Sequence, residues 1–377
     1  MRSGITGKRY LSFTVVGLLT ACVGRADIEL TDCWPDCAPL GGSGDVLEGI
    51  WLSGAEIASL PASGAAWDEV LRYANMTTTP DLSGVNSDGD VITLAKALVW
   101  ARTGQEQYRV EARSLCIAAI DTELAGTPQT LGSGLVGYVV AAELVGLEAV
   151  EDQQFRAWLR RTLAESLTDG GGYTLRSAHA QRPQVWGTMA GAGRMAVALY
   201  LEDAAELQGA IDVFRGFLGD RSAWADFSYD PDAASWSPFA ADNLQPLNPI
   251  GATVQGINVD GALIDAMRMG GPFAEPPVLV NAPWETLGGL LLQAEILHRK
   301  GYPAYEWENR AVERAYDYLW YLHQQHGGWF DAATGAGDDA WQLWIVNARY
   351  GSSFPTAPSA GIGKPMGFTD WTHRAAR

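Results

Sequence analysis

Basic residues are scarce in this 377-residue chain, which has 26 Lys and Arg against 44 Asp and Glu and a formal net charge of −18. Nucleic-acid binding depends on clusters of Lys and Arg that neutralise phosphates, so we expect no nucleic-acid partner. The sequence also lacks a glycine-rich dinucleotide turn, a phosphate-binding loop and a His-Glu-x-x-His helix. Cys33 and Cys37 have no second pair or nearby histidine to complete a zinc site. We therefore expect no cofactor and no catalytic metal.

Long apolar runs are also missing, because nothing after the N-terminus reaches the ~18 uninterrupted apolar residues that span a bilayer. Residues 2–9 supply three basic side chains and residues 11–19 a short apolar run, which is typical of an export signal. The run ends in Leu-Thr-Ala-Cys at 19–22, which is similar to a bacterial lipobox. We expect residues 1–21 to be removed and Cys22 to carry a lipid, so that the protein is exported and lipid-anchored, in the periplasm or at the outer membrane or cell surface. An ordinary signal peptide with a chance cysteine is the alternative.

The rest of the chain divides into a short linker and one large domain. Residues 22–49 are rich in Pro and Gly and predict a flexible tether, in which Cys33 and Cys37 could form a local disulfide. Residues 50–377 hold the folded domain. Cys116 lies in an apolar helical stretch, and we expect it in the core.

Apolar residues recur with helical period through most of this domain, and alternating β-branched runs are nearly absent. The pattern predicts an all-α fold of stacked helical hairpins, and an α/α toroid suits them better than a solenoid because no fixed repeat is visible. Expected helices cover 66–74, 91–101, 108–120, 135–147, 155–166, 189–201, 204–218, 284–298 and 306–323.

Two long segments interrupt the helical pattern. Residues 220–259 hold many aromatic, Asp, Asn and Pro residues, and a loop of this length is usually functional or disordered. Its aromatic content argues against disorder. Residues 350–373 form a Gly-, Ser- and Pro-rich tail that ends in Phe-Thr-Asp-Trp-Thr-His, an unusual density of aromatic and polar groups for a frayed end.

The densest polar cluster is 179–188, which combines His179, Arg182, Gln184 and Trp186 just before an expected helix. Functional residues favour such loops on a rigid scaffold. The alternative is a helix entry in which Thr188 caps the helix and Arg182 pairs with an acid. Carboxylate pairs for glycoside hydrolysis, such as 338–339, are available, but with 44 acids most are expected on the solvated surface.

The cluster belongs to a set of motifs that resembles the alginate-lyase-like polysaccharide lyases of bacteria, a superfamily of α/α toroids. Relatives carry His-Glu-x-Arg-Pro-Asn-Asn-Trp-Gly-Thr-His, and later Gly-Lys-x-Met-Gly-Trp-Thr-Asp-Trp-Thr-His. The resemblance covers about 131–373, and its matching positions are His179, Arg182, Pro183, 186–188, 213–221, 259–261, 268–271 and 363–373.

The resemblance implies β-elimination at a uronic acid of an acidic polysaccharide such as alginate. A donor neutralises the C6 carboxylate, a base removes the C5 proton and an acid protonates the departing O4. His179, Arg182 and Gln184 are the expected catalytic residues. The expected substrate-binding residues are Trp186, Asn258, Arg268, Trp284, Lys364, Trp371 and His373.

Some positions depart from the pattern of relatives. Gln184 and Val185 replace two asparagines, Met189 replaces a histidine, and Trp284 stands where relatives often have Tyr. A catalytically inactive, surface-exposed glycan-binding protein is therefore the first alternative, and an α/α-barrel glycoside hydrolase is the second. Structural roles are the alternatives for single residues: a buried hydrogen bond for His179, core packing for Trp186 and Trp371, and fixing of the tail for Lys364 and His373.

Overall fold

The structure is a computed structural model that describes residues 46–84, 86–334, 339–358 and 366–374. The expected signal peptide, Cys22, Cys33, Cys37 and Lys364 lie outside these residues. The described chain is mostly helical, and its one pair of strands is the short hairpin of β1 (Thr253–Val254) and β2 (Ile257–Asn258), so the all-α prediction is confirmed. No helix among the described residues is long and apolar enough to cross a membrane.

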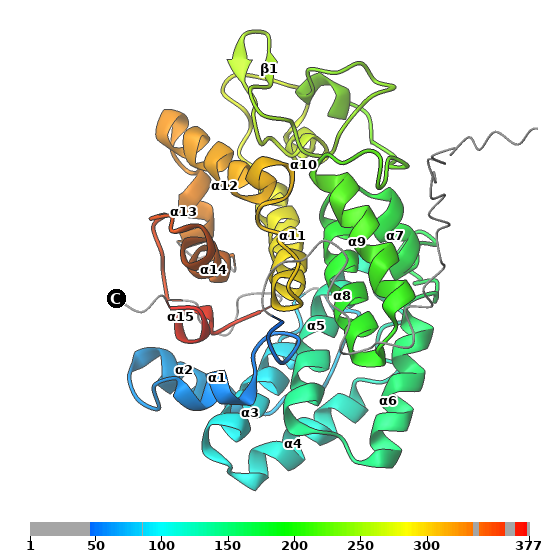
Figure 1. Cartoon of the computed structure of the whole chain (residues 1–377), viewed down its shortest axis with the longest axis vertical. Coiled ribbons are helices and arrows are strands. Elements are labelled where there is room, and N and C mark those ends of the chain that lie inside the picture. The colour runs from blue at the N-terminus through cyan, green and yellow to red at the C-terminus, as the bar shows by residue number, and fades with distance from the viewer. Residues whose placement is uncertain (1–45, 85, 335–338, 359–365, 375–377) are drawn as a thin grey trace, which may run out of the picture.

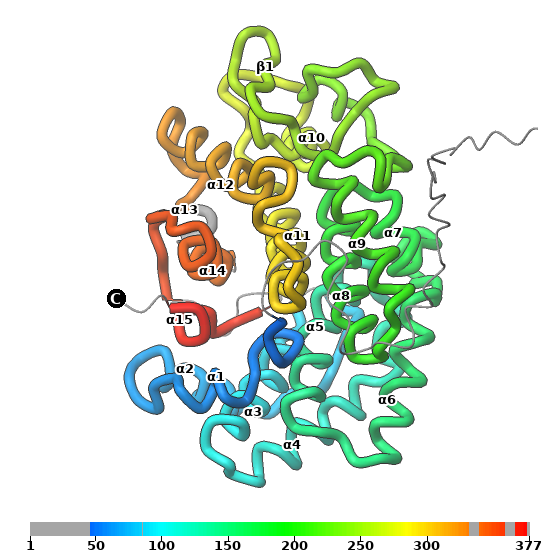
Figure 2. The backbone as a smooth tube through the Cα atoms, in the orientation of Figure 1, coloured from blue at the N-terminus to red at the C-terminus, as the bar shows by residue number. Residues whose placement is uncertain are grey.

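Four buried helices form the centre of the fold. They are α3 (Gly89–Thr103), α5 (Pro128–Val145), α8 (Val185–Leu201) and α11 (Ala282–Arg299), and each packs against the next in that order (Figures 1 and 2). Nearly all of their residues are buried, on every side of each helix. Helices that are buried on all sides are those that a protein surrounds with others.

Glycine lets these four helices approach closely. A Cβ on Gly193 of α8 would lie 2.7 Å from the carbonyl oxygen of Gly132 on α5, and one on Gly289 of α11 would lie 2.5 Å from the carbonyl carbon of Thr188. Real side chains essentially never come so near to a backbone, so the helix spacing requires glycine at these positions. These two contacts fix α5 and α11 closely against α8.

The surrounding helices each bury one face. In α4, for example, Tyr108, Ala112 and Cys116 are buried at a spacing of four residues, which confirms the core position expected for Cys116. These surrounding helices are α2 (Ala65–Ala74), α4 (Glu106–Ala118), α6 (Ala149–Thr162), α7 (Leu175–Gln181), α9 (Ala204–Leu218) and α12 (Trp307–His326).

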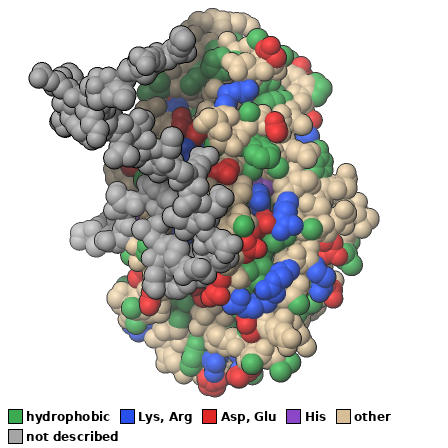
Figure 3. All heavy atoms as spheres, turned by 45° about the vertical axis from the view of Figure 1, so that its right-hand side comes forward, with side chains coloured by type: hydrophobic (Ala, Val, Ile, Leu, Met, Phe, Trp, Pro, Cys, Tyr) green, Lys and Arg blue, Asp and Glu red, His purple; other side chains and the backbone are tan. Residues whose placement is uncertain are grey.

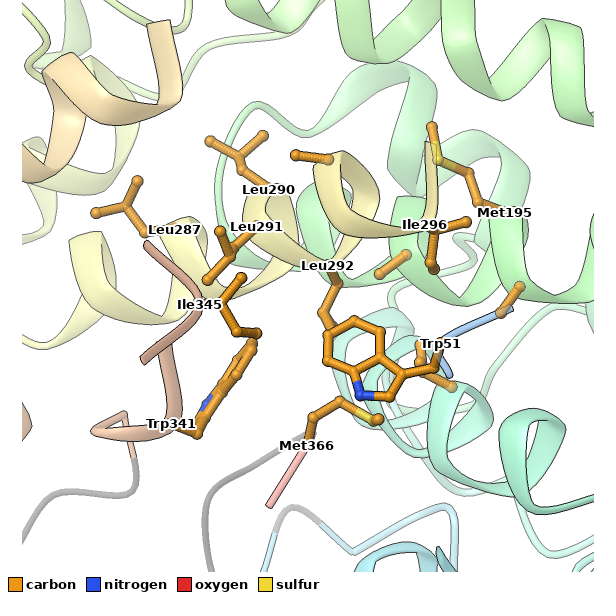
Figure 4. Packing of buried hydrophobic residues seen from close by; sticks show 14 of the residues in the cluster. Trp51, Met195, Leu287, Leu290, Leu291, Leu292, Ile296, Trp341, Ile345 and Met366 are labelled. Atoms are coloured by element: carbon orange, nitrogen blue, oxygen red, sulfur yellow. The ribbon is translucent and has the colours of Figure 1, made fainter. Parts of the chain in front are cut away.

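Both ends of the described chain pack onto this assembly. Leu47, in the last part of the expected tether, donates its backbone N–H to the carbonyl of Arg299 at 2.7 Å. The C-terminal helix α15 (Thr369–Thr372) contacts α2 and α14 (Trp341–Tyr350), as Figure 1 shows. In Figure 4, Trp51 and Met366 from these two ends meet the leucines of α11. The remaining short helices are α1 (Gly54–Ser59), α10 (Ile264–Met267) and α13 (Trp329–Thr334), and the 3-10 turns are η2 (Ala233–Trp236) and η3 (Arg268–Gly270).

The segment 220–259 is ordered against α7, as its aromatic content predicted. Trp224 donates its indole N–H to the Ala180 carbonyl at 2.8 Å, and the backbone N–H of Ser228 donates to the Gln181 carbonyl at 2.8 Å. The buried amide of Asn248 donates to the carbonyls of Trp236 and Val259. The loop therefore has a fixed place beside the polar cluster at 179–188.

Candidate functional site

A cavity of about 120 Å³ lies where the four central helices begin. Asp90 is in the first turn of α3, Gln129 in that of α5 and Glu285 in that of α11, and Met189 follows the first turn of α8. We call this cavity the helix-start pocket. Its described lining residues are Asp81, Leu82, Gly84, Asn86, Ser87, Asp90, Gln129, Thr130, Ser133, Gly134, Tyr138, Met189, Glu285 and Asp339.

The helix-start pocket combines the partial positive charges of helix starts with the negative charges of carboxylates. Each helix start carries a partial positive charge of about half an elementary charge, and residues in or just after the first turns of all four helices line this pocket. Four carboxylates, those of Asp81, Asp90, Glu285 and Asp339, share the lining, and no Lys, Arg or His is among its described members. Such a mixture of carboxylates, amides, hydroxyls and helix starts can hydrogen-bond a ligand rich in hydroxyl groups.

Tyr138 of α5 places an unsatisfied polar atom at the pocket. Its side chain is 1% exposed, and its hydroxyl has no hydrogen-bond partner among the described residues. Burial, together with the nearby charge of Asp90, raises the pKa of Tyr138, so the phenol keeps its proton at ordinary pH. Since a buried hydroxyl without a partner costs stability, it is a candidate for contact with a ligand.

Position 189 connects the sequence motif to the pocket. Met189 lines the cavity and is 5% exposed. The resemblance implies a histidine at this position, and the thioether of methionine neither takes up nor donates a proton at ordinary pH. Met189 is therefore the residue of this motif that lines the pocket, and its side chain can serve neither as a base nor as an acid.

The three expected catalytic residues do not share an open cleft. His179 lies on α7 and is 3% exposed, with Nδ1 3.5 Å from the guanidinium of Arg194. Gln184 is also 3% exposed and caps α8, because its Oε1 accepts the backbone N–H of Trp186 at 2.7 Å. Arg182 follows α7 and pairs with Asp230. None of the three is among the residues that line the helix-start pocket.

Arg182, Trp186 and Arg268 do come together, at a second polar group. The carboxylate of Asp230 accepts a 2.7 Å hydrogen bond from Arg182 and another from Arg268. Arg182 also lies over the ring of Tyr173, 5.9 Å from its centroid, and Tyr173 meets Trp186 edge-on. This Asp230 cluster fastens the loop 220–259 to the start of α8. On the face drawn in Figure 3, basic and acidic side chains are interspersed.

Two of the expected substrate-binding tryptophans belong to the core. Trp284 is 0% exposed and donates its indole N–H to the Trp329 carbonyl at 2.8 Å. Trp371 is 3% exposed and packs on Trp67. Contact with substrate is thus corrected to core packing for both, because neither ring offers a free face.

His373 and Asn258 also have structural surroundings. His373 Nε2 is 3.7 Å from the buried carboxylate of Glu295, and the imidazole packs on Trp51. Burial alone would raise the pKa of Glu295, but the nearby imidazole of His373 and hydrogen bonds from Arg349 lower it, so this carboxylate stays charged. Asn258 lies on the exposed strand β2, where its Oδ1 accepts the backbone N–H of Asp260.

Sequence reasoning did not single out Tyr138, Gln129 or Glu285. Each lies in a helix of ordinary composition. Gln129 and Tyr138 are on α5, whereas Glu285 is on α11, more than a hundred residues later in the sequence. No local signal marks them, since only the packing of α5 against α8 and α8 against α11 brings them together. Among the described residues no group of three or more His, Cys, Asp or Glu side chains is arranged to hold a metal ion.

Comparison with known proteins adds no family to these observations. No protein-family model matches the chain. No curated protein matches it significantly either.

Proposed function

We propose that this chain binds a glycan in the helix-start pocket and cleaves it by β-elimination, as a lipid-anchored exported protein. The proposal joins the motif resemblance to one observation, the buried and unpartnered hydroxyl of Tyr138 at this pocket. We also propose that the helical hairpins close into an α/α toroid with the pocket at its centre. The expected substrate is a uronate-containing polysaccharide such as alginate.

The chemistry needs a group that stabilises negative charge on the C6 carboxylate as the C5 proton leaves. In this pocket the four helix starts and the amides of Asn86 and Gln129 are placed to do so. This assignment replaces Arg182, whose guanidinium pairs with Asp230, and Gln184, whose amide oxygen caps α8.

We assign the two proton transfers to a lining carboxylate and to Tyr138. A carboxylate at the pocket takes the C5 proton, the C4–O4 bond breaks, and a C4–C5 double bond forms. The departing O4 takes a proton from Tyr138, whose raised pKa keeps the phenol protonated. Tyr138 is thus the proposed general acid.

Glycan binding without cleavage is the second candidate function, and Met189 favours it. The side chain at the position where relatives carry histidine faces the pocket but cannot act as a base. A protein with this substitution could keep the sugar site and lose the reaction.

One panel of polymers separates these functions. The protein would be incubated with uronate and neutral polysaccharides, with ultraviolet absorbance of the unsaturated product, new reducing ends and binding all measured. Unsaturated product from wild type that falls at least tenfold in Tyr138→Phe supports the lyase. Tyr302→Phe, a partly buried tyrosine outside the pocket, is the matched control.

The remaining outcomes point elsewhere. Binding that needs Tyr138, with no product on any polymer, supports the second candidate. New reducing ends without unsaturation would indicate hydrolysis by the carboxylates, and no binding to any glycan would overturn both proposals.

A further inference from the structure

A chain of polar groups, buried except for Arg176, runs from α9 to the start of α8 and passes through His179. The carboxylate of Glu206 on α9 accepts hydrogen bonds from Arg176 at 2.6 Å and from Arg194 at 2.5 Å. Arg194 then directs Nη1 toward Nδ1 of His179 at 3.5 Å. Three helices, α7, α8 and α9, contribute to this chain.

The contact with Arg194 fixes the tautomer of His179. A guanidinium has only donors, so Nδ1 must offer its lone pair, and a neutral ring then carries its proton on Nε2. Burial and the positive charge of Arg194 both lower the pKa of His179 well below its usual value, so the ring is neutral at ordinary pH. Arg176 and Glu206 are the other charged groups in this chain, and their opposite charges offset each other.

The Nε2 proton has an acceptor beside it on α11. A Cβ placed on Gly191 would lie 2.6 Å from His179 Nε2 and 2.6 Å from Gln293 Oε1, so both atoms border the space that this glycine leaves open. Gln293 Oε1 is buried and has no other hydrogen-bond donor among the described residues. Its Nε2 donates to the Thr188 carbonyl at 2.9 Å and to the Gly289 carbonyl at 3.2 Å.

We propose that His179 is a positioning residue, whose neutral imidazole donates its Nε2 proton to Gln293 and so aims the amide of Gln293 at the Thr188 carbonyl. Thr188 immediately precedes Met189 of the helix-start pocket, and Gln293 is on the same helix as Glu285. The imidazole therefore holds α8 and α11 in the register that forms the pocket. This role replaces general base catalysis, because His179 does not line the helix-start pocket.

The first test is spectroscopic and needs neither glycan nor catalysis. Long-range ¹H–¹⁵N correlation spectra of the imidazoles would be recorded for the wild-type chain between pH 8 and pH 5, with His179→Gln used to assign the signal. We expect His179 in the Nε2–H form throughout, and Gln293→Met should shift its Nε2 signal while leaving Nδ1 unchanged. A proton on Nδ1, or titration near pH 6.5, would overturn the proposal.

The second test asks whether the position of the side-chain donor matters, and it rests on the proposed glycan binding. His179→Gln places an amide near the position of Nε2, whereas His179→Leu fills similar space without a donor. We expect glycan affinity within about threefold of wild type for the first and at least tenfold weaker for the second. Equal affinities in the two variants would contradict the positioning role. A wild-type chain that binds no glycan would instead contradict the proposed function, and the spectra would still decide the tautomer.

Discussion

Trp371 donates its indole N–H to the carbonyl oxygen of Pro61 at 2.8 Å, although 310 positions separate the two residues in the sequence. The same indole packs on Trp67, with ring centroids 5.2 Å apart. Phe368 meets Tyr73 edge-on beside them. The C-terminal helix is therefore a part of the core that it shares with the first helices of the domain.

Replacing Trp371 should destabilise the whole domain. Trp371→Phe keeps an aromatic ring but leaves the Pro61 carbonyl without its donor, and we expect a loss of about 1–2 kcal/mol in the free energy of unfolding. Trp371→Ala adds a cavity and should cost about 3–5 kcal/mol. Urea unfolding followed by circular dichroism measures both. Trp186→Phe, at a partly exposed tryptophan, is the control, and an equal effect there would contradict the assignment.

The sequence predicted the helices that show a clear period, and the expected range 204–218 coincides with α9. It missed the first turns of α5, because Pro128, Gly132 and Gly134 resemble loop residues. Pro128 instead occupies the first turn after the Thr127 cap, and Gly132 faces α8. It also missed α7, since a polar helix of seven residues has too few turns to show a period.

The candidate site was less predictable than the helices. The motif around 179–188 indicated the right end of α8, since Met189 lines the pocket. Which side chains face that pocket depends on how distant helices pack together, and no short stretch of sequence reveals this packing. His179 and Gln184 show this limit, because chemically active residue types serve there as a buried contact and a helix cap.

The contact between α5 and α8 should be sensitive to a single methyl group. Gly132→Ala would push a Cβ against the Met189 carbonyl, and overpacking of this kind typically costs about 1–3 kcal/mol. Gly54→Ala is the matched control, because a Cβ there meets nothing within 4 Å at the start of α1. We expect that variant to be neutral or more stable by up to ~1 kcal/mol. Thermal and urea unfolding of the pair would show the difference, and similar stabilities would contradict the close approach.

The ion pair of Glu56 with Arg299 should make stability depend on pH in the acid range. Burial alone would raise the pKa of Glu56, but hydrogen bonds from Arg299 and Ser53 and the charge of Arg299 lower it to about 2. Because the pKa is lower in the folded state, the stabilisation is complete above the ordinary value of 4.5 and is lost as the pH falls toward 2. Glu56→Gln should therefore be less stable than wild type at pH 7, with the difference shrinking between pH 4.5 and pH 2. Urea unfolding at several pH values measures this. Asp226→Asn on the exposed loop is the control, and its free energy of unfolding should change with pH as that of wild type does.

Tyr138→Phe should separate stability from function. Removing a buried hydroxyl that has no partner among the described residues relieves a desolvation cost, so we expect unchanged stability or a gain of about 1 kcal/mol. Loss of glycan binding or product formation in the same variant would then reflect a lost contact with the ligand. A marked fall in the unfolding midpoint would show instead that the hydroxyl serves the fold.

Met189→His should add a histidine base to the pocket. General base catalysis typically contributes about 10²–10⁴-fold, so we expect at least a tenfold rise in unsaturated product from a uronate polymer, or its appearance where wild type forms none. The rate should increase with pH as the new imidazole loses its proton, near its ordinary pKa of about 6.5. Met189→Gln is the control, because it introduces a polar side chain of similar length that cannot accept the proton. If both variants bind glycan but neither forms product, the pocket recognises sugar without the geometry for elimination, and the binding function is the one to retain.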